Sequence, residues 1–419
     1  MLSRSSWFLL TLTFANVLGY VQNTDITDTT LDTIISETNS TLWAHFVEEN
    51  FATVNRRESK DDRFLGTVQL LRKYGYSVEE YFVITEDGYN LTIYRIPRSG
   101  PPVFLMHGVF SSSDDFLTGG SDRALAYQLA DAGYDVWLGN ARGSFYSRRH
   151  VTLSPEERSY WLFSWHEIGY YDLPAMIDFV LQITSRSQLV YIGHSQGTTT
   201  FYVLCSLRPE YNKKIILNIS LAPVAWIWHL KPPFIRAIIS LRKLEPFISF
   251  NLGLNEILPR SPFTIFVTAI LCSQNKLTLL VCITFLFTMF GFDYSGIHYE
   301  ALPVQLSHIP SGSSLRQLTH FAQEIETRRF EQYDHGTQEN LKLYGTEQPP
   351  SYPVQNVTAP TIIFFGLNDL ISVYDDTQIL IDRLPNVIGV YRIPQSKFNH
   401  FDFLWSKDVE QLLYWNLSI

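Results

Sequence analysis

Apolar and polar positions follow two alternating patterns along most of the chain. From about residue 63, short continuous apolar runs alternate with stretches in which apolar residues recur every third or fourth position. Continuous runs are typical of strands buried on both faces, and the longer period is typical of helices that cover a sheet. The runs predict strands at 103–106, 135–138, 189–192, 215–221, 361–365 and 389–392, and the periodic stretches predict helices at 122–131, 172–183, 198–207 and 374–383. The fold class is therefore α/β, with a mostly parallel central sheet covered by helices.

The alternation stops between about residues 224 and 323. Within this stretch, residues 261–292 contain a single charge, Lys276. A membrane span at 277–292 is one interpretation, but these sixteen residues are fewer than the roughly 20 that a spanning helix needs, and the sheet pattern resumes afterwards. We therefore expect 224–323 to form a helical cap or lid, inserted between a first core part at 63–223 and a second at 324–419.

The N-terminal region has a different composition. Residues 1–19 combine an arginine, an apolar run and a terminal small residue, which predicts a cleaved secretory signal peptide. Residues 20–62 are polar and lack an apolar period, so we interpret them as a leader or pro-segment. The chain is therefore expected in the secretory pathway.

Glycosylation sequons and cysteines are compatible with that route. We expect Asn39, Asn90 and Asn356 to be exposed acceptors, whereas Asn218 lies in a predicted core strand and Asn416 is a further match.

Three cysteines leave at least one unpaired within the chain. Cys272 and Cys282 are close enough to close a short loop, and two buried thiols in an apolar segment are the alternative.

Composition narrows the range of partners. The chain has 419 residues, of which 46% are hydrophobic, and a formal net charge of −9 without a basic block. This is enough apolar material for a large core, and it does not favour nucleic acid as a partner. A neutral substrate fits better.

One sequence motif carries the main chemical signal. Gly193-His194-Ser195-Gln196-Gly197 lies between a predicted strand and a predicted helix. A serine at such a turn has a strained backbone that exposes its hydroxyl, and glycines two residues to either side avoid steric overlap. Ser195 is therefore the predicted nucleophile, with Gly193 and Gly197 forming its elbow.

A serine hydroxyl needs a histidine base, and the base needs a carboxylate that fixes its tautomer. With a nucleophile at this kind of turn, the chain order is serine, acid, histidine. Asp369 follows the predicted strand 361–365, and His400 is the only histidine after it. A surface carboxylate or helix cap is the alternative role for Asp369, although Asp375 or Asp376 could serve as that cap.

The oxyanion formed during ester cleavage needs two N–H donors. Gln196 supplies one, because it follows the nucleophile, and the loop Met106-His107-Gly108-Val109 supplies the second through Val109. His107 itself is expected to have a structural role. His166-Glu167 does not continue into a two-histidine zinc motif, and no phosphate-binding or dinucleotide-binding glycine motif occurs. We therefore expect no metal and no cofactor.

The motifs as a set, from about residue 67 to 412, resemble the acid lipase family of α/β-hydrolases, which includes gastric lipase and lysosomal acid lipase. The matching segments are Thr85-Glu-Asp-Gly-Tyr89, His107-Gly108, Gly139-Asn-Ala-Arg-Gly143, Phe163-Ser-Trp-His-Glu167, Tyr171-Asp-Leu-Pro174, Gly193-His-Ser-Gln-Gly-Thr198, Leu221-Ala-Pro-Val224, Gly291-Phe-Asp293, Leu306-Ser-His308 and His400-Phe-Asp-Phe403.

The resemblance implies an α/β-hydrolase fold with an inserted cap and hydrolysis of acylglycerols or steryl esters at a lipid–water interface, in an extracellular or lysosomal setting. Ser195, Asp369 and His400 match the family's triad, and Val109, where leucine is more usual, and Gln196 match its oxyanion hole. Cys272 and Cys282 match a cysteine pair of the family's cap, which supports a disulfide. A lipid carrier without turnover is an alternative from another class, although a carrier would be free to lose the triad. A small-ester or peptide hydrolase is a second alternative.

Overall fold

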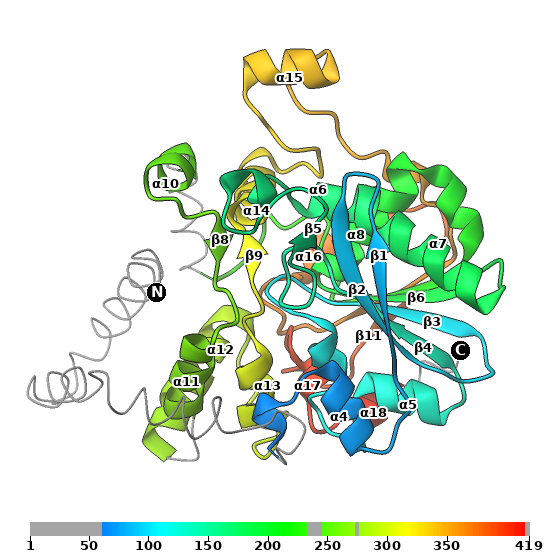
Figure 1. The fold of residues 1–419 in the computed structure, drawn as a ribbon, viewed down its shortest axis with the longest axis vertical. Coiled ribbons are helices and arrows are strands. Elements are labelled where there is room, and N and C mark those ends of the chain that lie inside the picture. Colours follow the sequence, from blue (N-terminus) through cyan, green and yellow to red (C-terminus); the bar gives the residue numbers. More distant parts are fainter. Residues whose placement is uncertain (1–60, 233–244, 273–275, 415–419) are drawn as a thin grey trace, which may run out of the picture.

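The computed structural model describes residues 61–232, 245–272 and 276–414. A nine-stranded sheet runs through the molecule in the order β1-β2-β4-β3-β6-β7-β10-β11, with β5 beside β2 (Figure 1). Six neighbouring strands, from β4 to β11 in that order, are parallel, and β2 is antiparallel to β1, β4 and β5. The strands are β1 (Glu79–Ile84), β2 (Tyr89–Ile96), β3 (Pro102–Met106), β4 (Asp135–Leu138), β5 (Arg149–His150), β6 (Leu189–His194), β7 (Ile215–Leu221), β10 (Thr361–Phe365) and β11 (Val387–Arg392).

The six predicted strands are the six parallel strands, and the predicted fold class is confirmed. The four predicted helices occur as α5 (Leu125–Asp131), α7 (Leu173–Thr184), α8 (Gln196–Leu207) and α16 (Tyr374–Arg383). Shorter elements of the sheet-and-helix region are η2 (Asp62–Phe64), α4 (Thr67–Lys73), η3 (Ser113–Phe116), η4 (Arg158–Trp161), α6 (Trp165–Glu167), η5 (Ile168–Asp172), η6 (Pro209–Lys214), η8 (Val354–Asn356), α17 (Asp402–Trp405) and α18 (Val409–Leu412).

Helices cover both faces of the sheet, and alternate strand residues face them. In β3, Phe104 and Met106 belong to the core layer that includes residues of α7 and α8, whereas Val103 and Leu105 belong to the layer that includes residues of α4, α5 and α17. All four side chains are at most 1% exposed. Burial on both faces explains why these strands have continuous apolar runs.

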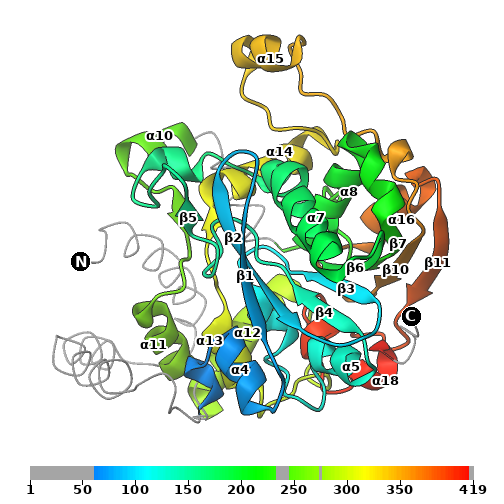
Figure 2. The same cartoon turned by 45° about the vertical axis from the view of Figure 1, so that its right-hand side comes forward.

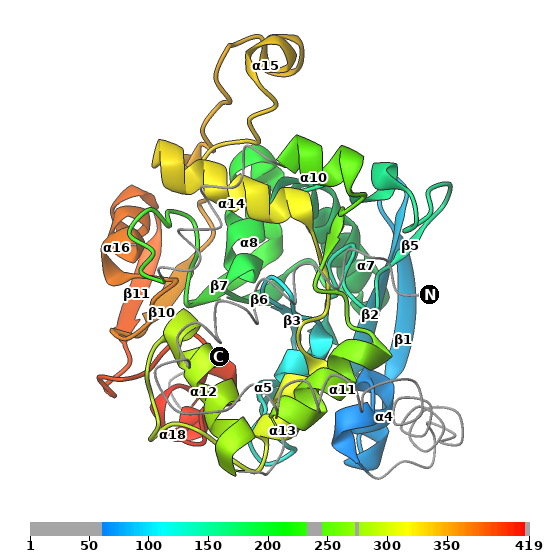
Figure 3. The ribbon, with the colours of Figure 1, turned by 90° about the vertical axis from the view of Figure 1, so that its left-hand side faces the viewer.

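The segment between β7 and β10 contains mainly helices. These elements are α10 (Glu245–Asn251), β8 (Glu256–Ile257), α11 (Pro262–Leu271), α12 (Lys276–Phe290), α13 (Leu302–His308), β9 (Ser313–Ser314), α14 (Leu315–Thr327) and α15 (Thr337–Tyr344). Figure 3 looks onto the carboxyl ends of the central strands, with α11, α12 and α13 on one side and α14 on the other. The helix α15 projects away from the body in all three views (Figures 1, 2 and 3). Within the described residues, no helix has the length and apolar character needed to cross a membrane.

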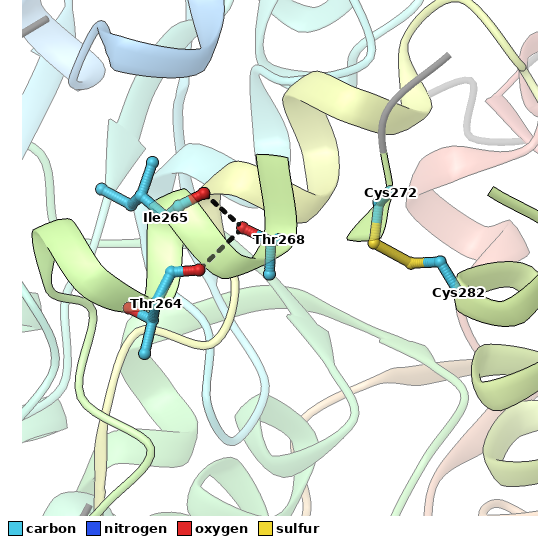
Figure 4. The surroundings of a disulfide bond; sticks show 5 residues. All are labelled: Thr264, Ile265, Thr268, Cys272 and Cys282. Atoms are coloured by element: carbon cyan, nitrogen blue, oxygen red, sulfur yellow. Dashed lines mark hydrogen bonds between the residues drawn. A yellow bond between two sulfur atoms is a disulfide. The ribbon is translucent and has the colours of Figure 1, made fainter. Parts of the chain in front are cut away.

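A disulfide connects α11 to α12. It joins Cys272 to Cys282, ten residues further along (Figure 4). In α11, the Thr268 hydroxyl donates to the carbonyl oxygens of Thr264 and Ile265 at 2.9 and 3.0 Å, so this polar side chain is satisfied within its own helix. The third cysteine, Cys205, is a buried free thiol in α8.

Three of the motifs quoted above meet at one buried ion network. Arg142 is 1% exposed, and its Nε donates to Asp172 Oδ1 at 2.7 Å. Its two terminal nitrogens donate to Asp87 at 2.5 and 2.8 Å, and its guanidinium carbon lies 3.9 Å from the centre of the Tyr89 ring. Asp87, Asp172 and Arg142 lie in the β1–β2 turn, at the start of α7 and in the loop after β4, so the network connects these three segments. Asp172 is completely buried, so its charge depends on Arg142 for compensation.

A second buried network fixes the start of α11. Asp114, in η3, is fully buried and accepts a hydrogen bond from Arg260 Nη1 at 2.8 Å. The same carboxylate accepts from Thr67 Oγ1 at 2.5 Å and from the Tyr146 hydroxyl at 2.9 Å. The guanidinium of Arg260 thus connects the chain just before α11 to the sheet-bearing part of the molecule.

Some sequence predictions fall outside the described residues. These are the signal peptide at 1–19, nearly all of the leader at 20–62, Asn39 and Asn416. Of the other acceptor residues, Asn218 is completely buried in β7 and Asn356 is exposed in η8. The expectation that Asn90 is exposed was wrong, because it is half-buried in β2 between β1 and β5 and its Oδ1 has no contact with solvent.

Candidate active site

Ser195 lies at the sharp turn between β6 and α8. Its φ of 53° is in the left-handed region, which a residue with a side chain rarely adopts. A methyl group at Gly193 would lie 2.8 Å from backbone atoms of Gly197, and one at Gly197 would lie 2.3 Å from the carbonyl oxygen of Met106. The two glycines thus allow the strained turn to pack against the end of β3.

The structure brings the three predicted triad residues together. His400 Nε2 is 2.8 Å from Ser195 Oγ, and His400 Nδ1 is 2.8 Å from Asp369 Oδ2. In the neutral tautomer that suits both contacts, Nδ1–H donates to the carboxylate and Nε2 accepts from the serine hydroxyl. The backbone N–H groups of Ile371 and Ser372 each donate to Asp369 Oδ1 at 2.8 Å. The carboxylate is thereby held in the orientation that the imidazole needs.

These residues come from the carboxyl ends of three parallel strands. Ser195 follows β6, Asp369 follows β10, and His400 lies beyond β11. Carboxyl ends of parallel strands lie at one edge of the sheet, which is why residues 205 positions apart in the chain, Ser195 and His400, meet there. The three side chains are 7%, 1% and 3% exposed, so the site is covered in this structure.

The loop after β3 lies against the nucleophile. A methyl group at Gly108 would be 3.1 Å from Ser195 Cβ and 3.4 Å from its Oγ. In the part of the chain that the structure describes, the N–H of Val109 makes no hydrogen bond, and Gln196 provides the first N–H of α8. First-turn N–H groups have no partner within their helix. Both predicted donors thus lie on segments that adjoin Ser195, beside the positive end of a helix dipole.

His107 has the contacts of a structural residue. Its Nε2 accepts from the N–H of Ala141 at 3.2 Å, so Nδ1–H donates to the carbonyl oxygen of Gly108 at 2.8 Å. Burial lowers the pKa of His107 to about 4, which keeps the ring neutral. The side chain fixes the loop that carries Val109.

Several residues that support the site were not predicted to do so. His194 Nε2–H donates to the carbonyl oxygen of His400 at 3.0 Å, and burial lowers the pKa of His194 to about 3. The carbonyl oxygen of Phe290, at the end of α12, accepts from the His400 N–H at 3.4 Å, and the two rings are stacked with centres 6.0 Å apart. Gln196 Nε2 donates to Gln317 Oε1 of α14 at 2.7 Å. His194 belongs to the motif around Ser195, and Phe290 directly precedes the motif at 291–293, whereas Gln317 lies in no motif.

No group of three or more metal-ligating side chains occurs in the described ranges. The arrangement consists of a serine hydroxyl, an imidazole, a carboxylate and two backbone N–H groups on adjoining segments. Chemically, such a set can transfer an acyl group from an ester to the serine and then to water.

Comparison with known proteins agrees with this chemistry. Residues 67–120 match the model of a partial α/β-hydrolase lipase region, and residues 101–282 match the model of the α/β-hydrolase fold. The chain is 43% identical to Lipase 1 of Drosophila melanogaster over 365 residues, which are 86% of this chain and 80% of that protein. It is 38% identical to human gastric triacylglycerol lipase over 358 residues, which are 83% of this chain and 88% of the other.

A solved structure supports the fold. The crystal structure of a proposed lipase from Sulfolobus solfataricus covers 81% of this chain and 92% of its own, with a TM-score of 0.57 and 15% sequence identity. At this identity the likeness concerns the fold alone.

Proposed function

This chain belongs to the acid lipase family of α/β-hydrolases, and we propose that it hydrolyses triacylglycerols, steryl esters or both through Ser195, His400 and Asp369. That it is a lipase, and hence a carboxyl-ester hydrolase, follows from its relatives. The observation that supports the proposed residues is the unbroken hydrogen-bond chain from Ser195 Oγ through His400 to Asp369, with both contacts at 2.8 Å.

The proposed reaction passes through an acyl-enzyme. His400 Nε2 takes the Ser195 proton as Oγ attacks the ester carbonyl, and the N–H groups of Val109 and Gln196 bind the resulting oxyanion. The protonated imidazole, stabilised by Asp369, then gives its proton to the leaving alcohol. His400 Nε2 then takes a proton from a water molecule as it attacks the acyl group, and returns that proton to Ser195 Oγ as the acyl–oxygen bond breaks and the fatty acid leaves. Each proton thus passes through one atom, His400 Nε2.

Access to the serine requires movement of the covering chain. Ser195 is 7% exposed, and Phe290 of α12 lies over His400. We infer that the segment between β7 and β10 acts as a cap over the site and opens at a lipid–water interface. Exposed aromatic side chains on α10, Phe247 at 55% and Phe250 at 68%, support contact with an apolar surface.

We infer a secretory route that leads outside the cell or to the lysosome. Support comes from the signal-like start of the chain, from the Cys272–Cys282 disulfide and from the exposed sequon at Asn356. Asn39 is a second proposed glycosylation site.

A comparison of two serine substitutions tests the proposal. Ser195→Ala should lower fatty-acid release on the order of 10⁶-fold, to the background of the assay. Ser206→Ala is the matched control, because Ser206 lies in α8, the helix that follows Ser195, and its hydroxyl donates to the carbonyl oxygen of Val203. Equal release by Ser195→Ala and the unmodified protein would contradict the proposal. Emulsified triolein and cholesteryl oleate, assayed side by side, separate glyceride from steryl ester hydrolysis.

A further inference from the structure

A pair of buried carboxyl groups lies beside the loop that carries His400. Asp402 begins α17, and Asp293 lies in the connection after α12; they are 5% and 0% exposed. The two side chains face each other across Gly296, where an added methyl group would lie 2.7 Å from Asp293 Oδ2 and 3.3 Å from Asp402 Oδ1, and they interact as a hydrogen-bonded pair. A hydrogen bond between two carboxyl groups requires a proton on one of them, so this contact exists only while one group is neutral.

The surrounding donors determine which carboxyl group holds the proton. Asp293 Oδ1 accepts from the N–H groups of Ser295 and Gly296, both at 3.0 Å, and from the Ser295 hydroxyl at 2.6 Å. Its Oδ2 accepts from Gln395 Nε2 at 2.5 Å. Asp402 accepts only from the N–H of Asn399, at 2.7 Å. Because hydrogen-bond donors favour the ionised form, the more weakly solvated Asp402 is where we place the proton of the pair.

Within the described residues, the titratable groups around Asp402 include no lysine or arginine. Besides Asp293, they are Asp369 after β10, His400 two residues earlier, and His298 before α13, which lines the same cavity of about 40 Å³. Burial lowers the pKa of His298. In the described ranges, neither carboxyl group forms an ion pair with lysine or arginine. Burial, with the charge of Asp293 added, raises the pKa of Asp402 to about 8.

Asp402 is directly connected to the position of His400. The Oδ1 of Asn399 accepts from the N–H groups of Phe401 and Asp402 at 2.9 and 3.2 Å, while Asp402 accepts from the Asn399 N–H. His400 therefore lies inside a short loop that is closed from both ends. Asn399 Nδ2 also donates to the carbonyl oxygen of Gly291 at 3.0 Å, so the loop is attached to the end of α12 beside the carboxyl pair.

We propose that protonated Asp402 is a positioning residue for His400, which it holds in line with Ser195 by donating its proton to Asp293. The inference rests on the proposed function, because it takes His400 as the catalytic base. Loss of the proton replaces the hydrogen bond with two facing carboxylates. The loop then loses one of its attachments to the connection after α12, while the Asn399–Gly291 bond remains, and turnover falls although the triad residues are unchanged.

Two substitutions at Asp402 test this role through the pH profile of kcat. Asp402→Asn keeps a donor for Asp293 and an acceptor for Asn399 but does not ionise. It should keep kcat within about threefold at pH 6, and it should remove the loss of kcat that the unmodified protein shows around pH 8, the pKa of Asp402. Asp402→Leu lacks both contacts and should lower kcat about 10- to 100-fold, with a smaller change in KM.

Glu324→Gln is the matched control. Glu324 is a buried carboxyl group of α14 whose two oxygens make no hydrogen bond, and burial raises its pKa, but it does not contact the His400 loop. This variant should keep the alkaline loss of kcat. An unchanged alkaline loss in Asp402→Asn, or full kcat in a folded Asp402→Leu, would overturn the proposal.

Infrared spectroscopy provides a readout that does not need turnover or the leucine variant. In a Ser195→Ala background, a band of a protonated carboxyl group should be present at pH 6, should titrate near pH 8, and should be missing when Asp402→Asn is added. Absence of that difference band would overturn the proposal. Failure of the proposed function is a separate result, since it would appear as undiminished fatty-acid release by Ser195→Ala.

Discussion

The contact between Gly197 and the end of β3 leads to a sharp prediction for Gly197→Ala. The added methyl group would lie 2.3 Å from the carbonyl oxygen of Met106, 2.9 Å from its carbonyl carbon and 3.0 Å from the carbonyl oxygen of His107. All three atoms belong to the backbone, so no side-chain rotation relieves the overlap. Real Cβ atoms essentially never lie closer than 3.0 Å to another heavy atom. To reach that separation, α8 and the loop after β3 must move apart by about 0.7 Å.

Two costs follow from this displacement. Forcing an extra carbon into a packed interior destabilises a protein by about 1–3 kcal/mol, of which the better helix propensity of alanine returns less than about 1 kcal/mol. The displacement also changes the distance from Ser195 to the N–H of Val109. Because misplacement of reacting groups by about 1 Å costs on the order of 100-fold in rate, we expect kcat to fall about 10- to 100-fold.

Gly119→Ala is the matched control. A methyl group at Gly119 would meet only Ala124, at 3.5 to 3.7 Å, which is ordinary van der Waals contact. Thermal melting and fatty-acid release should therefore change little in Gly119→Ala, while both decrease in Gly197→Ala. If Gly197→Ala melts and turns over like the unmodified protein, the packing argument for the elbow is refuted.

Three further predictions concern stability. Arg142→Met leaves Asp172 buried without its cation and should cost about 3–5 kcal/mol in urea unfolding; an unchanged midpoint would contradict the role of the network. Cys272→Ser opens a ten-residue loop and should cost up to about 3 kcal/mol, and identical melting of the unmodified protein with and without reductant would argue against it. Burial raises the pKa of Glu324, so its contribution to stability is present in acid and is lost as pH rises through that raised pKa. Glu324→Gln should thus melt like the unmodified protein at pH 5 but higher at pH 9, and an equal difference at both values would contradict this assignment.

The parallel part of the sheet was predictable because its strands are buried on both faces. Their apolar runs are continuous, and three of the six predicted strands have the bounds of the structure. The antiparallel strands β1 and β2 were not predicted. In β1, Phe82 and Ile84 are 47% and 59% exposed, so apolar residues do not mark the buried face there.

The site residues were predictable only where a local motif or a fixed order along the chain marks them. The turn at Ser195 has a local pattern, and the acid and base follow in a fixed order. The carboxyl pair could not be found in this way, because Asp293 and Asp402 are more than 100 residues apart and nothing in the two segments that contain them pairs one with the other. Their contact depends on how the connection after α12 packs against the His400 loop.

The Arg260–Asp114 contact restricts how a cover over Ser195 can move. Separating a buried, hydrogen-bonded ion pair costs about 3–5 kcal/mol, which would leave fewer than about one molecule in a hundred open at equilibrium. Motion that pivots around Arg260 avoids this cost, since the guanidinium stays on its carboxylate. In the proposed opening of the cap, the start of α11 beside Arg260 would therefore stay in place, and the other end of α11 would move furthest.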